Sequence, residues 1–306
     1  TESLNIALKG LLHSGDHVIS TSMEHNAMAR PLYTLSQRGV EWTAVACAAD
    51  GSLDPENIRK AIKPNTRMVA MLHASNLCGT IMPITEVGKI CRENGLIFLV
   101  DSAQTAGVLP LDVEAQNIDL LAFTGHKGLL GLQGTGGLYV SAGIEISPLK
   151  EGGTGSFSEH LQHPGFMPDR LESGTPNTPG IVGLLAGVEF ILQTGRENIR
   201  HHEQELTKML LDGLQEIKGI KIYGPHDSKR QTAVVAFNID DVDCGELSMQ
   251  LDYQYGIVTR SGLHCAPLSH QTIGTLGSGS CRLSPGYFTT KEEIETVIRA
   301  VNDISK

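Results

Sequence analysis

The sequence predicts an α/β protein with a large domain built on a mainly parallel sheet and a smaller α+β domain after it. Short apolar runs alternate with segments of helical periodicity through the first half of the 306 residues, which is typical of βαβ units. Polar side chains directly follow several of these runs, where parallel sheets bind their ligands. The last third mixes strands and helices in a different order.

The first half is predicted to open with a helix, since Leu4, Ala7, Leu8 and Leu11 recur at helical spacing. A loop containing Glu-His-Asn leads into a second helix. Asp54-Pro55 begins a third, because a capping residue precedes a proline at the first helical position. A fourth covers 84–93 and ends at Asn94-Gly95. The predicted strands are 17–20, 41–47, 67–72, 96–100, 119–123 and 136–140.

Residues 152–178 are rich in Gly, Ser, Thr and Pro, and a loop this long in a compact domain is usually functional. We predict a buried helix at 179–193 and a second helix at 197–218, with a domain boundary between them. The large domain is then 1–195, including 152–178 as an active-site loop, and the small domain is 196–306. The small domain is predicted to contain strands 221–223, 233–239, 256–260 and 282–284, a helix at 245–255, and a last helix that begins with a capping box at Thr290 and Glu293.

Composition excludes several classes of protein. The net charge of −10 argues against a nucleic-acid partner or an anionic membrane surface. No apolar run approaches the roughly 18 to 20 residues of a membrane span, and the start lacks a basic region typical of a signal peptide. The six cysteines are scattered without a Cys-x-x-Cys pair, which predicts no metal site, no disulfide scaffold and a reducing cytoplasm.

Lys127 and Asp101 are the first candidate functional residues, because each follows an apolar strand. Burial at the rim of a core lowers the pKa of an amine and frees a nucleophile, as a Schiff base with an aldehyde cofactor requires. The carboxylate of Asp101 is suited to pair with a protonated ring nitrogen of such a cofactor. The structural alternative for Lys127 is a surface lysine in a loop, and that for Asp101 is a helix cap.

Four further residues have both a functional and a structural interpretation. His25 is a candidate to stack on a flat ring or to transfer protons, or it is structural. Thr1, before a helix N-terminus, is suited to bind phosphate or simply to cap that helix. Cys265 lies in a polar loop near Arg260 and His264, and neighbouring cations make a thiol nucleophilic; most lone cysteines are core residues instead. Arg282 is suited to hold a substrate carboxylate, or it forms an ordinary salt bridge.

Taken in order, the segments Thr-Glu, EHN, HASN, DSAQ, TGHK, ESGTPNT, RSGLHCA and CRLS resemble pyridoxal-phosphate enzymes of the class V aminotransferase group. The resemblance covers essentially the whole chain and is closest to the cysteine desulfurases of the selenocysteine lyase-like branch. It implies the fold of type I pyridoxal-phosphate transferases, a homodimer, and conversion of L-cysteine to L-alanine with a persulfide left on the enzyme. A sulfur-acceptor protein and a link to iron–sulfur cluster assembly are further implications.

The resemblance also assigns roles to individual residues. Lys127 would be the Schiff-base lysine and Cys265 the thiol that attacks sulfur. Asn76 and Arg282 would bind the substrate carboxylate, with Arg260 nearby. The remaining positions would bind the cofactor: Asp101 and Gln104 at the ring, His25 stacked on the ring, and Thr1, Thr124, His126 and, from the other subunit, Thr175 at the phosphate.

Two departures from the family pattern are visible in the sequence. Leu263 stands where the family often has a second histidine, which affects proton handling around Cys265. The family's segment ahead of the Thr-Glu pair is expected to be missing from this chain.

The leading hypothesis is therefore a cysteine desulfurase. The alternatives are another pyridoxal-phosphate enzyme (a selenocysteine lyase acting on selenocysteine, an aminotransferase or an epimerase), or a non-catalytic sulfur-transfer scaffold. Cys265 discriminates between a desulfurase and an aminotransferase, because an aminotransferase needs no thiol in that loop.

Overall fold

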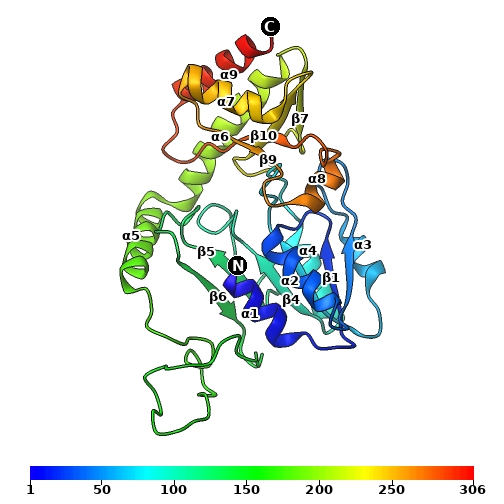
Figure 1. Cartoon of the computed structure of the whole chain (residues 1–306), viewed down its shortest axis with the longest axis vertical. Helices are drawn as coiled ribbons and strands as arrows, with labels where there is room; N and C mark the ends of the chain where they lie inside the picture. The colour runs from blue at the N-terminus through cyan, green and yellow to red at the C-terminus, as the bar shows by residue number, and fades with distance from the viewer.

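The computed structural model describes all residues, Thr1–Lys306, and contains two sheets stacked along the long axis of the molecule (Figure 1). The larger sheet has the order β2-β1-β3-β4-β5-β6. All neighbours in it are parallel except β5 and β6, so the prediction of a mainly parallel sheet is confirmed. Its strands are β1 His17–Thr21, β2 Glu41–Val45, β3 Thr66–Leu72, β4 Ile97–Asp101, β5 Leu120–Thr124 and β6 Gly136–Val140.

Four helices cover the two faces of this sheet: α1 Glu2–Leu11, α2 Asn26–Ser36, α3 Pro55–Ala61 and α4 Ile84–Glu93. The alternation of side chains along β3 explains why both faces are buried. Met68 and Ala70 point into the core under α1 and α2, whereas Val69 and Met71 point into the core under α3 and α4. A strand buried on both faces reads in the sequence as a continuous apolar run.

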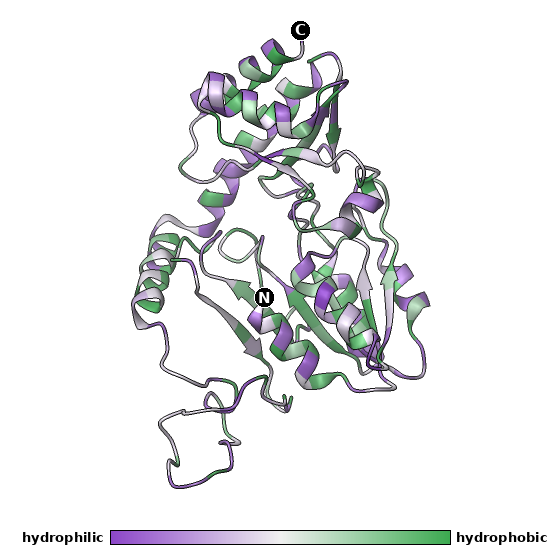
Figure 2. Cartoon of the chain, viewed as in Figure 1, coloured by the Kyte–Doolittle hydropathy of each residue, from purple (hydrophilic) through white to green (hydrophobic).

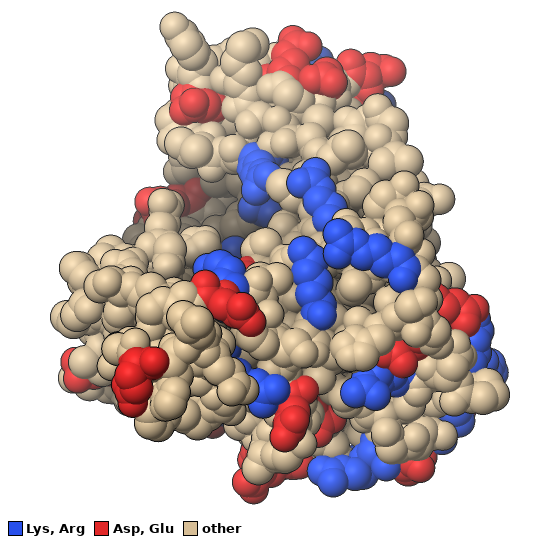
Figure 3. Space-filling model, turned by 60° about the horizontal axis from the view of Figure 1, so that its bottom comes forward, with Lys and Arg blue, Asp and Glu red and all other residues tan.

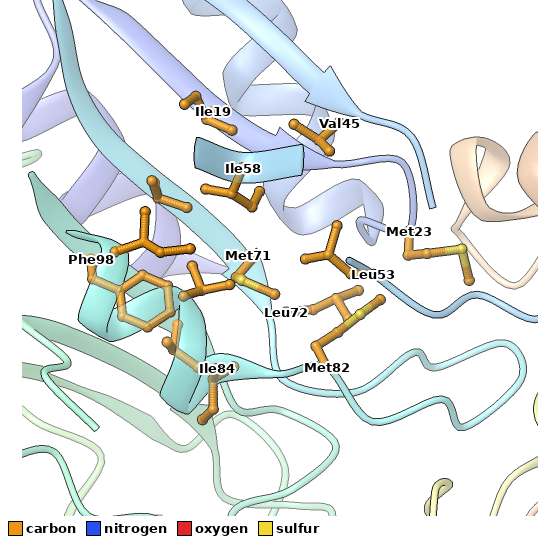
Figure 4. Packing of buried hydrophobic residues seen from close by; sticks show 14 of the residues in the cluster. Ile19, Met23, Val45, Leu53, Ile58, Met71, Leu72, Met82, Ile84 and Phe98 are labelled. Carbon is orange, nitrogen blue, oxygen red and sulfur yellow. The ribbon is translucent and has the colours of Figure 1, made fainter. Parts of the chain in front are cut away.

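Figure 4 shows the second of these cores, in which Phe98 of β4, Met71 of β3 and Ile58 of α3 pack together. All three side chains are fully buried. The predicted cap of α3 is present, since the Asp54 carboxylate accepts a hydrogen bond from the Glu56 N–H at 3.0 Å. The strand ends that carry the site are therefore fixed by two cores on opposite faces of the sheet.

The second sheet is antiparallel, with the order β7-β8-β10-β9. Its own core is closed by helices α6, α7 and α9, which contribute Leu210, Leu247 and Val301. The predicted capping box is present, with both hydrogen bonds between Thr290 and Glu293. The elements are α6 Arg196–Gln215, β7 Ile220–Tyr223, β8 Val235–Ile239, α7 Cys244–Tyr255, β9 Arg260–Gly262, α8 Pro267–Ile273, β10 Ser280–Leu283 and α9 Lys291–Ile304.

One local prediction in this half is wrong, and one short helix was missed. The predicted strand at 256–260 does not form, and the strand β9 begins only at Arg260, because Gly256 adopts a left-handed conformation to end α7 and the chain pairs with β10 only from Arg260 onward. Helix α8 was not predicted. It is a short helix with proline at its first position and Gly274 at its end, and its hydrophobic pattern is too short to detect.

Helix α5, Thr178–Thr194, is the largest disagreement, because the sequence predicts a buried helix there. Figure 2 shows it as a hydrophobic helix on the flank of the sheet. Ile181, Val182, Leu185 and Leu192 are 52–76% exposed in this chain. The apolar composition predicted burial, yet within one chain nothing covers that face.

The segment between β6 and α5 has no regular secondary structure, and Figure 1 shows part of it extending away from both sheets. No single helix has the length and apolar composition of a membrane span, although α5 and α6, bent by 83°, meet those two criteria when taken together.

Candidate active site

Four segments that follow strands of the large sheet meet at its carboxyl edge and enclose a cavity of about 290 Å³. Asp101 is the last residue of β4, Lys127 follows β5, Asn76 follows β3, and His25 follows β1. This confirms the expected convergence for these side chains. His73, which also follows an apolar strand and was therefore expected at this edge, does not line the cavity: it is buried, and its Nδ1 hydrogen bonds to Thr105 Oγ1 at 2.9 Å.

Lys127 lies at the mouth of the cavity, and its amine forms no hydrogen bond or ion pair with the protein. The residue as a whole is exposed, but burial around the amine lowers its pKa. Asp101 opposes this shift, and the guanidinium groups of Arg282 and Arg260 add to it. The lysine therefore has the lowered pKa that its position in the sequence predicts, which favours a reactive amine.

Asp101 is 8% exposed, and its two carboxylate oxygens differ in their contacts. Oδ1 accepts a hydrogen bond from the Ala103 N–H at 2.9 Å, so the residue does cap a turn. Oδ2 accepts no hydrogen bond from the protein and remains available to a ligand. The neighbouring Gln104 also lines the cavity, and its side chain makes no hydrogen bond within the protein. The structural and the functional interpretations of Asp101 are compatible.

His25 likewise has a structural contact and also faces the cavity, whereas its role at a cofactor ring stays a prediction. Its Nδ1 accepts a hydrogen bond from the Ala27 N–H at 3.0 Å and caps helix α2. In the neutral ring this bond places the proton on Nε2. Burial lowers the pKa of His25, which favours the neutral form. The side chain lines the 290 Å³ cavity and two neighbouring cavities, of about 340 Å³ and about 360 Å³.

Thr1, Thr124 and His126 line the end of the cavity that lies against the N-terminus of α1. Thr124 Oγ1 and His126 Nδ1 are 2.9 Å apart and hydrogen bond to each other. Thr1 is the N-cap residue of α1, but its hydroxyl makes no capping bond, so it is free to bind an anion at the helix N-terminus. Thr175 is exposed and lies outside the site of its own chain.

Asn76 and Arg282 line a second cavity, of about 340 Å³, which shares His25, Gln104 and Lys127 with the first. Arg282 Nη1 donates a hydrogen bond to the Asn76 carbonyl at 2.8 Å. Asn76 Oδ1 and Arg282 Nε are buried and have no partner in the protein. Buried polar atoms are nearly always hydrogen-bonded, so these two orphaned atoms indicate a site that is completed by a ligand.

Cys265 is the one exposed cysteine of the six, and Arg260 Nη2 lies 3.4 Å from its Sγ. His264 and Cys265 both have positive φ angles, 50° and 56°, so the loop between β9 and α8 projects the thiol outward in a strained conformation. The Asn26 N–H donates a hydrogen bond to the Cys265 carbonyl at 2.8 Å and ties this loop to the start of α2.

The expectation that His264 assists Cys265 as a cation is wrong. The His264 ring is buried and stacks on His270 with 9° between the ring planes. Its Nδ1 lies 3.3 Å from His270 Nε2, and its Nε2 bonds to the Arg260 carbonyl. Burial lowers the pKa of His264 to about 4, so the ring is neutral at physiological pH and Arg260 is the cation beside the thiol.

Glu24, beside His25, is a buried residue that sequence reasoning missed; it lines none of the three cavities but supports the strand ends that carry the site. Its fully buried carboxyl accepts hydrogen bonds from the Thr21 hydroxyl at 2.6 Å and the Leu72 N–H at 3.1 Å, which joins the ends of β1 and β3. Burial raises the pKa of Glu24 to about 8. No signal in the sequence marks it, because its neighbours Ser22, His25 and Asn26 are themselves polar.

The other five cysteines are buried or half-buried. Burial raises the pKa of Cys47 and of Cys281 to about 11, so these thiols are poor nucleophiles at neutral pH. Cys265 is therefore the only cysteine with access to solvent and a neighbouring cation.

Comparisons with known proteins agree with this geometry. The family model for class V aminotransferases matches residues 1–297. A probable cysteine desulfurase of Methanothermobacter thermautotrophicus is 35% identical over all of this chain and 77% of that protein. A cysteine desulfurase of Escherichia coli is 34% identical over all of this chain and 76% of that protein.

A solved structure is similar as well. The apo cysteine desulfurase of Thermococcus onnurineus superposes with a TM-score of 0.91 at 33% sequence identity, over 99% of this chain and 77% of that one.

Proposed function

This chain belongs to the class V aminotransferase family, and we propose that it is a cysteine desulfurase that converts L-cysteine to L-alanine and leaves the sulfur on Cys265 as a persulfide. Members of the family are pyridoxal-phosphate enzymes. The observation that carries the proposal is the exposed thiol of Cys265, whose partner Arg260 also lines the cavity of Lys127. An aminotransferase needs no such thiol.

The residues of the first cavity fit pyridoxal phosphate. Lys127 offers an unpaired amine, Asp101 a free carboxylate oxygen, and Thr1, Thr124 and His126 polar groups at a helix N-terminus. Gln104 and His25 would lie along the ring. When bound, the cofactor supplies an electron sink for the charge that develops at the substrate's α-carbon.

Arg282 and Asn76 would orient the substrate by its carboxylate. The Nε–H of Arg282 has no partner in the protein. The side-chain amide of Asn76 has two N–H groups; one donates a hydrogen bond to the His264 carbonyl, and the other is available to the substrate. A charge-assisted hydrogen bond from arginine satisfies the buried guanidinium and fixes the direction of the sulfur-bearing side chain. Binding therefore supplies an acceptor for Arg282 Nε and for the second N–H of Asn76, whereas Asn76 Oδ1 is itself an acceptor and needs a donor from elsewhere.

Lys127 is placed to move the α-proton of the substrate, because its lowered pKa favours the neutral amine that accepts a proton. The Cys265 thiolate then attacks the sulfur atom of the substrate. An S–S bond forms on Cys265 as the carbon–sulfur bond breaks, and the carbon takes up protons to become alanine. The strained loop between β9 and α8 holds the thiol outward, where Sγ is accessible to an acceptor but does not line the cavity of Lys127. Attack on the substrate therefore requires this loop to turn inward.

The homodimer is part of the proposal. The exposed apolar face of α5 supports it, because contiguous apolar patches of this kind mark protein interfaces. Thr175 lies near this helix and outside its own site, as a residue donated to the partner's phosphate site would.

A sulfur acceptor, with a link to iron–sulfur cluster assembly, completes the proposed function.

All six cysteines are free thiols, which supports a reducing compartment such as the cytoplasm.

The deciding experiment is incubation of the pyridoxal-phosphate-loaded protein with L-cysteine and a reductant, with alanine and sulfide measured together. We expect equal amounts of both from the wild type, and loss of both in Cys265→Ala. Cys47→Ala is the matched control and should keep activity, because that thiol is half-buried. Undiminished sulfide release by Cys265→Ala would refute the proposal. Faster alanine formation from selenocysteine than from cysteine would reassign the protein as a selenocysteine lyase.

A further inference from the structure

A polar groove of about 360 Å³ opens beside Cys265, on the outer side of His25 and away from the cavity of Lys127. Helices α1 and α2 form its walls, and the loop that carries Cys265 closes one end. The groove is lined by Thr1, Asn5, Lys9, His25, Asn26, Ala27, Arg30, Pro31, Thr34 and Cys265.

Two unpaired cations and no carboxylate line this groove. Lys9 and Arg30 are both exposed, and neither forms an ion pair or a side-chain hydrogen bond. The chain as a whole carries a net charge of −10, whereas the groove beside the reactive thiol is lined by two cations and no acidic residue. Figure 3 shows basic side chains gathered around the hollowed face of the molecule, with acidic ones mostly toward its margins.

We propose that this groove binds the sulfur acceptor, and that the acceptor is a low-molecular-weight thiol that carries carboxylates. This inference rests on the proposed desulfurase function. The volume falls in the range of small-molecule sites, and the two cations complement carboxylates. The neutral polar residues Asn5, Asn26 and Thr34 supply hydrogen bonds for the rest of such a molecule.

The transfer step is a thiol exchange that needs no further reactant. The acceptor thiolate attacks the outer sulfur of the Cys265 persulfide and forms a new S–S bond. The bond between the two sulfurs on Cys265 breaks, and its electron pair stays on Cys265 Sγ as a thiolate. Arg260 Nη2, 3.4 Å from Sγ, stabilises that leaving thiolate, and the acceptor departs with a persulfide of its own.

The test follows the discharge of the persulfide directly. The pyridoxal-phosphate-loaded enzyme is charged with L-cysteine, freed of excess substrate, and mixed with mercaptosuccinate, 2-mercaptoethanol or cysteamine. Loss of the extra sulfur is followed by intact mass. The ratio of the mercaptosuccinate rate to the 2-mercaptoethanol rate is compared between variants, so that the intrinsic nucleophilicity of each thiol cancels.

In the double variant Lys9→Glu with Arg30→Glu we expect this ratio to fall by about tenfold or more, since two favourable pairs become repulsive. The corresponding ratio for cysteamine should rise, and the 2-mercaptoethanol rate should stay unchanged. The double variant Arg38→Glu with Lys60→Glu is the matched control, because it makes the same charge change on two exposed residues outside the groove. High salt should weaken the preference of the wild type.

An unchanged ratio in the double variant would overturn the inference, and so would an equal slowing with all three thiols. Failure of the proposed function is distinguishable from either result, because the wild type would then form no alanine and no persulfide in the charging step.

Discussion

The side-chain amide of Asn76 donates a hydrogen bond to the backbone carbonyl of His264, with Nδ2 and O 2.8 Å apart. The two residues are 188 positions apart in the chain. The bond joins the loop after β3 to the strained loop that carries Cys265. One side chain thus belongs both to the proposed carboxylate site and to the support of the nucleophile.

Asn76→Ala should loosen the loop of Cys265 as well as weaken substrate binding. Loss of the hydrogen bond leaves a carbonyl unsatisfied, which costs about 1–3 kcal/mol. We expect kcat/KM for L-cysteine to fall roughly 10-fold to 100-fold. Hydrogen–deuterium exchange over 263–266 should become faster without substrate, an effect that loss of carboxylate binding alone does not produce.

The matched control for Asn76 is Asn238→Ala. Asn238 also has an unpaired Oδ1 and donates to a backbone carbonyl, that of Gly279, but it lies in β8 away from the cavities. This variant should lose stability and keep the exchange rate over 263–266. Equal exchange at the cysteine loop in Asn76→Ala and in the wild type would show that the bond does not hold the loop.

Lys127→Arg should lower alanine formation on the order of 10³-fold or more, because a guanidinium stays protonated and serves neither as nucleophile nor as base. Lys89→Arg, on the exposed face of α4, is the control and should be fully active. Alanine is measured under saturating pyridoxal phosphate and L-cysteine. Substantial activity of Lys127→Arg would remove Lys127 from the mechanism.

Glu24 should make the stability of the protein depend on pH. Its pKa is raised from the ordinary range to about 8 in the folded protein, so the folded state keeps a proton that the unfolded state releases at lower pH. The free energy of unfolding therefore decreases as pH rises from about 5 to about 8. Above that range it keeps the full decrease, because Glu24 is then ionised in both the folded and the unfolded state.

Glu24→Gln removes this penalty, so the stability of the variant relative to the wild type should increase from pH 5.5 to pH 8.5, roughly the range of this titration. Urea unfolding at several pH values measures the difference. Glu86→Gln, on the exposed face of α4, should show no such trend. A difference between Glu24→Gln and the wild type that stays constant with pH would contradict the protonation of buried Glu24.

Leu185→Arg should convert the proposed dimer to a monomer. Leu185 is 54% exposed at the centre of the apolar face of α5, and a charge there would have to be desolvated in an interface. Size-exclusion chromatography with light scattering reports the mass. Tyr253→Arg on α7 introduces the same residue at a 92% exposed position and should leave the mass unchanged. A monomeric wild type would refute the dimer.

The sequence alone predicted much of the fold and the polar rim of the site. Parallel strands buried on both faces appear as continuous apolar runs, and the residue that ends such a run must lie at the carboxyl edge of the sheet. This pattern is enough to place Asp101 and Lys127 together at that edge. The order of the motifs along the chain identified the family, since each short motif sits at the end of an element whose length is fixed by the fold.

Only the tertiary structure determined what depends on distant contacts. The bond between Asn76 and His264, and the turning of the His264 ring away from Cys265 toward His270, are set by packing between loops of the two sheets. The exposure of α5 is equally invisible in sequence, because an apolar helix reads the same whether its own chain or another one covers it. Lys9 and Arg30 line the same groove because α1 and α2 pack side by side on the sheet. The periodicity of each helix in the sequence does not show that the two helices are neighbours.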